Sequence, residues 1–291
     1  MKGIKKKLNL DKLTICYTMT EEVFTELKNI EKERLYDCFS LTRYDDPKKF
    51  FKDCFIIKAK EPDTNGGVQW IKYAELKFNM RTDEDTTSLY TWVYFENKTL
   101  YTPFYSNNTI ICYADYITDT LGLKYNNITS LDIAFDSNIH IAKRIKKAIF
   151  NPEVNVILNG KLRNDQYEVL SEILYLTKGN QIRMTELSIY VQQSKKEGFE
   201  MCSYDKCKEI SKSQKKYVAK SIGIDKNIFR TEIRLKNQHV KQYFNHNRVK
   251  EELLLQYLND EDFLYKMFIH FANRLLRFKD KKGHIYSVVD I

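Results

Sequence analysis

The sequence predicts an α+β fold in which antiparallel sheets are flanked by helices and which ends in C-terminal helices. Three observations lead to this class. Segments with alternating apolar and polar residues follow one another across short turn-rich stretches, other segments have the 3.6-residue spacing of amphipathic helices, and no strand–GxGxxG–helix unit of a doubly wound fold is present. One arrangement within this class has two related sheet layers.

The first half of the chain reads mainly as strands. Residues 13–19 alternate like a strand, and residues 21–39 have helical spacing. Residues 108–122 form either a short buried strand or a helix that ends at Gly122. Further strands are predicted from alternation and from β-branched or aromatic content at 50–60, 68–80 and 89–102.

The second half mixes strands and helices. A strand at 128–136 precedes a helix at 137–151, with Ser137 or Asn138 as its N-cap. Residues 185–192 and 198–206 form a hairpin, and 228–236 is the clearest strand of the chain. Two amphipathic helices follow, at 242–258 and 260–278. We place a domain boundary after residue 125, which gives an N-terminal α+β region (1–125) and a region with the C-terminal helices (126–291).

Composition excludes several classes of protein. The chain has 291 residues, 43% hydrophobic and 30% charged, with 9 Gly and 4 Pro, which is the composition of a globular protein. No apolar stretch reaches the roughly 18 residues of a membrane span, and no apolar core follows the basic start, so we expect a cytoplasmic protein that does not enter a membrane. The six cysteines form no CxxC pair, which favours reduced thiols.

The net charge of +9 favours polyanionic partners, although the richness in Lys, Asn, Ile and Tyr is also typical of AT-biased coding. Motifs for common hydrolases are missing: the sequence holds no GxxxxGK[ST], HExxH or GxSxG, and its five histidines form no His-hydrophobic-His pair. Nucleotide, zinc and serine hydrolysis therefore lack their residues.

Polar residues gather in three segments of the second half. Alternation in LDIAFD places Asp132 and Asp136 on one face of a strand, and in FRTEIRL it places Arg230, Glu232 and Arg234 on one face. These residues could equally form a cross-strand ion-pair ladder or cap strand ends. Between the two strands, the segment MCSYDKCKE supplies three further polar residues: Tyr204, Lys206 and Glu209.

These three segments in order resemble replication initiation factors of the Rep_trans type, which start rolling-circle replication of small plasmids and some phages. The resemblance covers residues 128–236. The residues that carry it are the apolar run 187–191, Ser194, Phe199, the triplet Tyr204-Asp205-Lys206, Glu209, and a final run with Arg230, Glu232 and Lys236. The family's Gly-Ser-Arg turn is here residues 192–194, Gln-Gln-Ser, so one basic contact of the family pattern is missing.

The resemblance implies an endonuclease that nicks and closes one DNA strand. Tyr204 would attack a phosphodiester, giving a 5′-phosphotyrosine intermediate and a free 3′-OH. Because a phenol has a pKa near 10, it needs a neighbour that takes its proton or stabilises its charge, and we assign this role to Lys206 and Glu209. Tyr190, on the partner strand of the hairpin, is the alternative nucleophile. Arg230, Arg234, Lys195 and Lys196 are the predicted DNA contacts.

The implied reaction also needs a divalent metal, Mg²⁺ or Mn²⁺, which prefers carboxylate oxygens. Asp132 and Glu232, from two strands, are the first choice of ligands. Asp136 is the third candidate, although it lies roughly 13 Å from Asp132 along an extended strand at about 3.3 Å per residue. Glu209 is either a further ligand or the proton acceptor. The resemblance implies an origin with an inverted repeat as the DNA partner, and allows a homodimer and a host helicase.

Two alternatives use the same scaffold. The first is a DNA-binding replication factor or repressor without chemistry, for which Asp132 and a metal are irrelevant. The second is a mobilisation relaxase, which uses the same tyrosine chemistry and prefers a single-stranded transfer origin.

Overall fold

The computed structural model of the chain describes residues 5–46, 48, 50–62, 67–80, 89–101, 110–163, 182–184, 188–192, 198–223, 227–250 and 254–290. The chain divides into two compact units. Unit 1 comprises 1–10, 132–247 and 260–291, and unit 2 comprises 11–131 and 248–259. The division falls within two long strands, β1 (Lys6–Thr18) and β7 (Lys124–Ser137), which contribute residues to both units.

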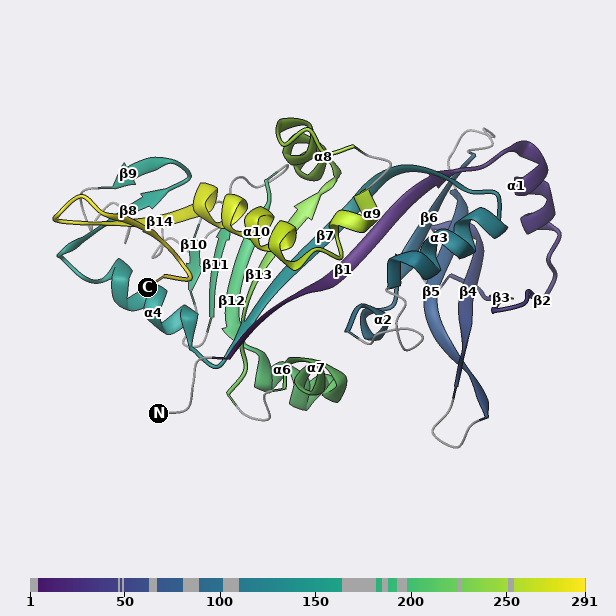
Figure 1. Cartoon of the computed structure of the whole chain (residues 1–291), viewed down its shortest axis with the longest axis horizontal. Helices are drawn as coiled ribbons and strands as arrows, with labels where there is room; N and C mark the ends of the chain where they lie inside the picture. The colour runs from purple at the N-terminus through teal and green to yellow at the C-terminus, as the bar shows by residue number, and fades with distance from the viewer. Residues whose placement is uncertain are drawn as a thin grey trace. The chain divides into compact units, whose positions relative to one another are not determined.

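Unit 2 is built on an antiparallel meander, in which β1 pairs with β6 and the strands then follow in the order β6-β5-β4-β3-β2 (Figure 1). Its core is apolar and aromatic, with Phe39, Phe55 and Phe78 fully buried. Besides parts of β1 and β7, the described elements of unit 2 are α1 (Glu21–Lys28), β2 (Glu33–Leu35), β3 (Phe39–Arg43), β4 (Phe51–Pro62), β5 (Val68–Met80), β6 (Tyr90–Phe95), α2 (Asn97–Tyr101), α3 (Ile110–Thr120) and α9 (Leu254–Tyr257).

Unit 1 holds strands in the order β10-β11-β12-β13-β7 and a smaller antiparallel sheet in the order β15-β14-β8-β9. Besides parts of β1 and β7, its described elements are α4 (Ile141–Ile149), β8 (Val154–Leu158), β9 (Lys161–Arg163), β10 (Ile182–Met184), β11 (Ser188–Gln192), β12 (Glu200–Asp205), α6 (Lys206–Ser213), α7 (Lys216–Ile222), β13 (Phe229–Lys236), α8 (Asn237–His246), α10 (Glu261–Leu275), β14 (Leu276–Asp280) and β15 (Ile285–Ser287).

The predicted α+β class is confirmed, because antiparallel sheets and helices make up the described residues. The hairpin of β11 and β12 and the strand β13 lie where the alternation placed them. The ambiguous segment 108–122 is the helix α3, and Gly122 follows it with a positive φ of 66°. No helix among the described residues is long and apolar enough to cross a membrane.

Several predicted helices are shorter than their periodicity indicated. The helix expected over 21–39 ends at Lys28, and residues 33–35 instead pair with β3. The helix expected over 242–258 is divided into α8 and α9, and the one expected over 260–278 changes into β14 at Leu276. Pairing of Leu276 with Leu158 of β8 explains the last change, since a neighbouring strand competes for the backbone.

Two smaller differences concern the end of a predicted strand and the N-cap of a predicted helix. The strand expected over 89–102 ends at Phe95, and α2 follows from Asn97. The N-cap of α4 is His140, whose Nδ1 accepts the backbone N–H of Lys143 at 3.2 Å, rather than Ser137 or Asn138. A ring nitrogen thus takes the place of the usual hydroxyl or amide acceptor at this helix start.

Arg43 explains why α1 stops early. Its guanidinium donates to the carbonyls of Lys28 at 2.8 Å and Ile30 at 2.6 Å, and it forms an ion pair with the buried Asp53 at 2.7 Å. These bonds satisfy carbonyls that the end of a helix leaves without partners.

Replacement of Arg43 by methionine is expected to lower the free energy of unfolding by about 2–4 kcal/mol. The Asp53 carboxylate loses its cation and keeps the Asn79 amide as a side-chain donor, and two carbonyls lose the guanidinium. Urea unfolding followed by circular dichroism measures this change. Arg34→Met is the control in the same unit, since Arg34 and its partner Glu26 are both largely exposed, and we expect a loss of at most about 1 kcal/mol. Equal losses in the two variants would contradict the assigned role.

Candidate active site

Strands β11, β12 and β13 present one polar and one apolar face. The register places Ser188, Tyr204 and Arg230 side by side in one row. The next rows on the same face are Tyr190–Cys202–Glu232 and Gln192–Glu200–Arg234. The opposite face carries rows such as Val191–Met201–Ile233, all fully buried. Alternation along the strands therefore collects the chemistry-bearing side chains on one face.

Helix α10 covers the apolar face. Its Phe268 stacks on Phe135 of β7 at 5.7 Å between ring centroids, and its Phe271 meets Phe199 edge-on at 4.9 Å. Figure 1 shows α10 lying across these strands. Because this helix takes the apolar side, the face that carries Tyr204 is the one that can receive a polar substrate.

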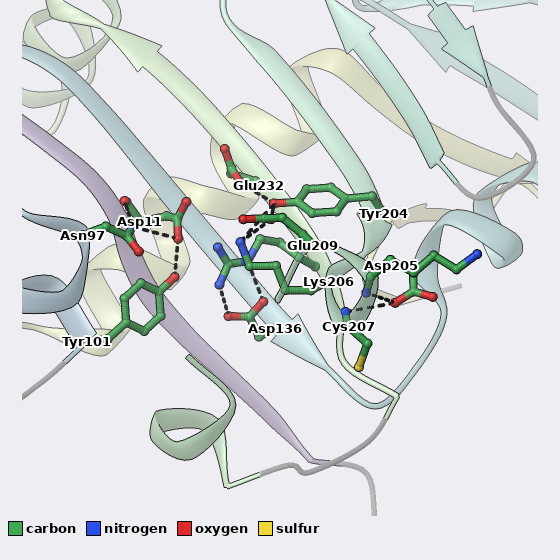
Figure 2. A network of polar contacts seen from close by, with 12 residues as sticks. Asp11, Asn97, Tyr101, Asp136, Tyr204, Asp205, Lys206, Cys207, Glu209 and Glu232 are labelled. Atoms are coloured by element: carbon green, nitrogen blue, oxygen red, sulfur yellow. Dashed lines mark hydrogen bonds and ion pairs between the residues drawn. The ribbon is translucent and has the colours of Figure 1, made fainter. Parts of the chain in front are cut away.

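The hydroxyl of Tyr204 lies between two carboxylates. Its oxygen is 3.1 Å from Oε2 of Glu209 and 3.1 Å from Oε2 of Glu232, as Figure 2 shows. With a single proton, the phenol donates to one of them at a time. The ring is half-buried, and it is thus neither a core side chain nor remote from acidic groups.

Lys206 supplies a cation to the same group. Its ammonium donates to Oε2 of Glu209 at 2.5 Å and lies 3.5 Å from the Tyr204 oxygen, while its side chain is only 2% exposed. The intervening residue explains this placement. Asp205 ends β12 and caps α6 by accepting the backbone N–H groups of Cys207 and Lys208, so the chain turns sharply and Lys206 faces back toward Tyr204.

Burial raises the pKa of the Tyr204 phenol, and the negative charge of Glu232 raises it further. The resting state is therefore a neutral phenol that needs a base at the moment of attack. Cys202, in the next row, is also held neutral: burial raises the pKa of its thiol, and the charges of Glu232, Glu200 and Asp132 act in the same direction.

The structure corrects two predicted roles. Arg230 and Asp136 are both fully buried and form a bidentate ion pair, with Nε to Oδ1 at 2.7 Å and Nη2 to Oδ2 at 2.6 Å. Arg230 therefore does not reach a DNA backbone, and a guanidinium without exposed surface holds both Asp136 oxygens, so they are not free for a metal. Glu232 is also buried and paired, but its partner Arg234 is 44% exposed. The strand alternation placed these residues on the correct face but gave no sign of how deep they lie.

The other predicted residues remain compatible with their roles. Arg234 is partly exposed and bonds Glu200 and Glu232, so it borders the site, and its contact with DNA stays a prediction. Asp132 is half-buried on β7, next to β13 in the sheet. Lys195 and Lys196 lie outside the described residues. Sequence reasoning missed Glu200, although the alternation in residues 200–204 already placed it on the face of Tyr204.

Two of the predicted ligands carry donor atoms that fit a divalent metal. Asp132 and Glu232 come from neighbouring strands and carry the hard oxygens that Mg²⁺ and Mn²⁺ prefer. Within the described ranges, no three Asp, Glu, His or Cys side chains are gathered into a closed cation site. Two carboxylates suit a metal that takes its remaining ligands from water and substrate phosphate.

Comparison with known proteins gives a structural likeness and no match to a family model or a curated protein. A solved structure of a rolling circle replication initiator protein from Geobacillus stearothermophilus is similar, with 14% sequence identity, a TM-score of 0.47, and coverage of 96% of this chain and 88% of that chain.

Proposed function

We propose that this protein initiates rolling-circle replication by nicking one DNA strand with Tyr204 as the nucleophile. The observation that carries this proposal is the phenol held between two carboxylates and an ammonium group on the polar face of the sheet. The ordered motifs of β12, α6 and β13 and the net charge of +9 support a DNA substrate.

The first step is attack of the Tyr204 oxygen on a backbone phosphorus. Glu209 takes the phenolic proton, because its side chain is 36% exposed and can release that proton to water. The bond from phosphorus to the 3′-oxygen breaks, the 3′-oxygen takes a proton from solvent, and the 5′-phosphate stays on Tyr204. Reversal of these steps by a 3′-OH rejoins the strand.

Lys206 and Glu232 have separate tasks in this scheme. The Lys206 ammonium, close to the attacking oxygen, offsets the negative charge that develops on the phosphoryl oxygens. Glu232 orients the phenol through its Oε2 while Arg234 holds its Oε1 at 2.7 Å. Together with Asp132, Glu232 would hold Mg²⁺ or Mn²⁺. A bound divalent cation supplies charge neutralisation at the phosphate.

The test is formation of a covalent protein–DNA adduct. Supercoiled plasmid carrying the replicon's own origin, incubated with the protein and Mn²⁺, is expected to yield nicked circles with protein attached, and EDTA is expected to prevent this. Digestion and mass spectrometry should place the nucleotide on the peptide that contains Tyr204. A protein that binds the DNA but forms no adduct would instead be a replication factor without chemistry, and preference for a single-stranded origin would indicate a mobilisation relaxase.

Replacement of Lys206 by methionine is expected to slow cleavage by about 10²-fold, since one preorganised charge near the reacting phosphate is lost. Affinity for origin DNA should change little. Lys208→Met is the matched control, because Lys208 is exposed on the same helix, and it should cleave at nearly the rate of the unmodified protein. Single-turnover nicking rates measure both. Equal rates for Lys206→Met and the unmodified protein would exclude a role for this ammonium in the chemistry.

A further inference from the structure

A second polar pocket lies in unit 1, away from the Tyr204 face. It has a volume of about 420 Å³ and forms where the turn between β8 and β9 meets the end of α10 and the start of β14. Helix α10 covers the sheet face opposite to Tyr204, so this pocket is separate from the candidate active site. The residues that line it are Asn159, Gly160, His270, Asn273, Arg274 and Arg277.

The wall of the pocket at the β8–β9 turn is fixed. Asn159 and Gly160 both have positive φ, 49° and 77°, which is the conformation of an Asn-Gly hairpin turn. The backbone N–H of Asn159 donates to the Leu275 carbonyl at 2.9 Å, and its Nδ2 donates to the Gln192 carbonyl at 3.3 Å. The turn is thus tied to α10 and to β11, and it presents backbone and amide groups in a set position.

The pocket carries positive charge without acidic partners. Of the six described residues that line it, three are basic and none is acidic. Arg274 lies over the Phe199 ring at 5.4 Å, and among the described residues neither Arg274 nor Arg277 has a carboxylate partner. Arg43, Arg230 and Arg234, by contrast, are all paired with carboxylates. Charge of this kind in a concave site attracts anions.

Arg277 and Asn273 each bring a polar atom with unused hydrogen-bonding capacity to the pocket residues. Nε of Arg277 and Oδ1 of Asn273 are buried and have no hydrogen-bond partner within the described parts of the chain. A buried polar atom without a hydrogen bond costs free energy, so each of these two atoms calls for an explanation. A bound anion satisfies the Arg277 donor, and rotation of the Asn273 amide would present its NH₂ group to the same anion.

We propose that this pocket binds a phosphate group. Arginine forks match phosphate geometry, and a turn with a glycine admits close approach of the ligand. The phosphate belongs either to a nucleic-acid backbone or to a small free phosphate, and the chemistry of recognition is the same for both. This site does not depend on the reaction at Tyr204, because the two use different residues on opposite faces of the sheet.

The imidazole of His270 reports on the pocket directly. Burial, with the charges of Arg274 and His246, lowers its pKa, so the ring is largely neutral near pH 7. An anion bound beside it should raise that pKa, which NMR titration of the ring protons measures in the presence of inorganic phosphate or of a short DNA duplex. Running the titration on the Tyr204→Phe protein separates this test from that of the proposed function.

A response of His270 to inorganic phosphate, to DNA or to both supports the site, and the pattern identifies the source of the phosphate. No response to either ligand overturns it. Arg274 is at an exposed position, and Arg274→Gln is expected to lower the affinity for the ligand about tenfold, as for loss of one charged hydrogen bond. The ligand concentration at which the His270 pKa shift is half complete measures this affinity. Lys266→Gln removes one charge from an exposed position of the same helix outside the pocket and should change affinity less than twofold. Equal weakening in these two variants would contradict the pocket.

Discussion

Tyr204→Phe is expected to abolish strand cleavage and leave DNA affinity unchanged. The substitution removes the attacking oxygen, and we expect the rate to fall by roughly 10⁴-fold or more, as for other covalent nucleophiles. The ring keeps its place on the sheet, since only the contacts of its hydroxyl with Glu209, Glu232 and Lys206 are lost. Nicking of supercoiled origin DNA, together with a filter-binding measurement of affinity, checks both parts of this expectation.

Tyr190→Phe is the matched control for this experiment. Tyr190 lies on the neighbouring strand β11, on the same face as Tyr204 and one row away, opposite Cys202. Tyr190→Phe removes a phenolic hydroxyl just as Tyr204→Phe does, yet we expect cleavage to continue at nearly the rate of the unmodified protein. If Tyr190→Phe were inactive and Tyr204→Phe active, the nucleophile would have to be reassigned.

Arg230→Ala is expected to destabilise unit 1 by about 3–5 kcal/mol. The substitution leaves the fully buried carboxylate of Asp136 without its bidentate partner, and an unpaired charge in the interior is costly. Urea or thermal unfolding measures the loss. Lys281→Ala breaks the exposed pair with Glu153 in the same unit and should cost at most about 1 kcal/mol.

A double variant separates pairing from packing at this position. Arg230→Met with Asp136→Leu replaces both charges by apolar side chains, and buried ion pairs replaced in this way often lose little stability. We expect the double variant to be more stable than Arg230→Ala alone. A double variant as unstable as the single one would show that the pair acts through its shape rather than through its charges.

Much of the fold follows from the sequence, because alternation in strands has a physical cause that is local. Residues 68–80 and 228–236 were predicted nearly to their ends. The helix ends were harder to predict. Lys28 ends α1 because Arg43, distant in sequence, takes its carbonyl, and Leu276 leaves the helix because a strand of the smaller sheet pairs with it. Such tertiary contacts leave no periodic signal.

The candidate active site was also predictable in part. The resemblance carried by the ordered motifs implied that Tyr204, Lys206, Glu209 and Glu232 act together, and the structure joins all four through hydrogen bonds. Spacing could not show that Asp136 and Arg230 neutralise each other, since depth in the sheet depends on what covers it. The basic pocket between the β8–β9 turn and α10 had no motif at all, because its residues are far apart in sequence.

The cross-strand register of β12 has a consequence for how this chain can evolve. Tyr204 lies opposite Arg230 on one face of the sheet. The adjacent pair, Ser203 of β12 and Thr231 of β13, points to the other face, and the two hydroxyls are hydrogen-bonded at 3.0 Å. Deletion of a single residue from this strand would carry the phenol into the interior and bring core methyl groups out to solvent. Variants that lose the proposed reaction but still accumulate in the cell are therefore expected to arise by amino-acid substitution. In-frame deletions in β12 are expected to yield protein that is degraded.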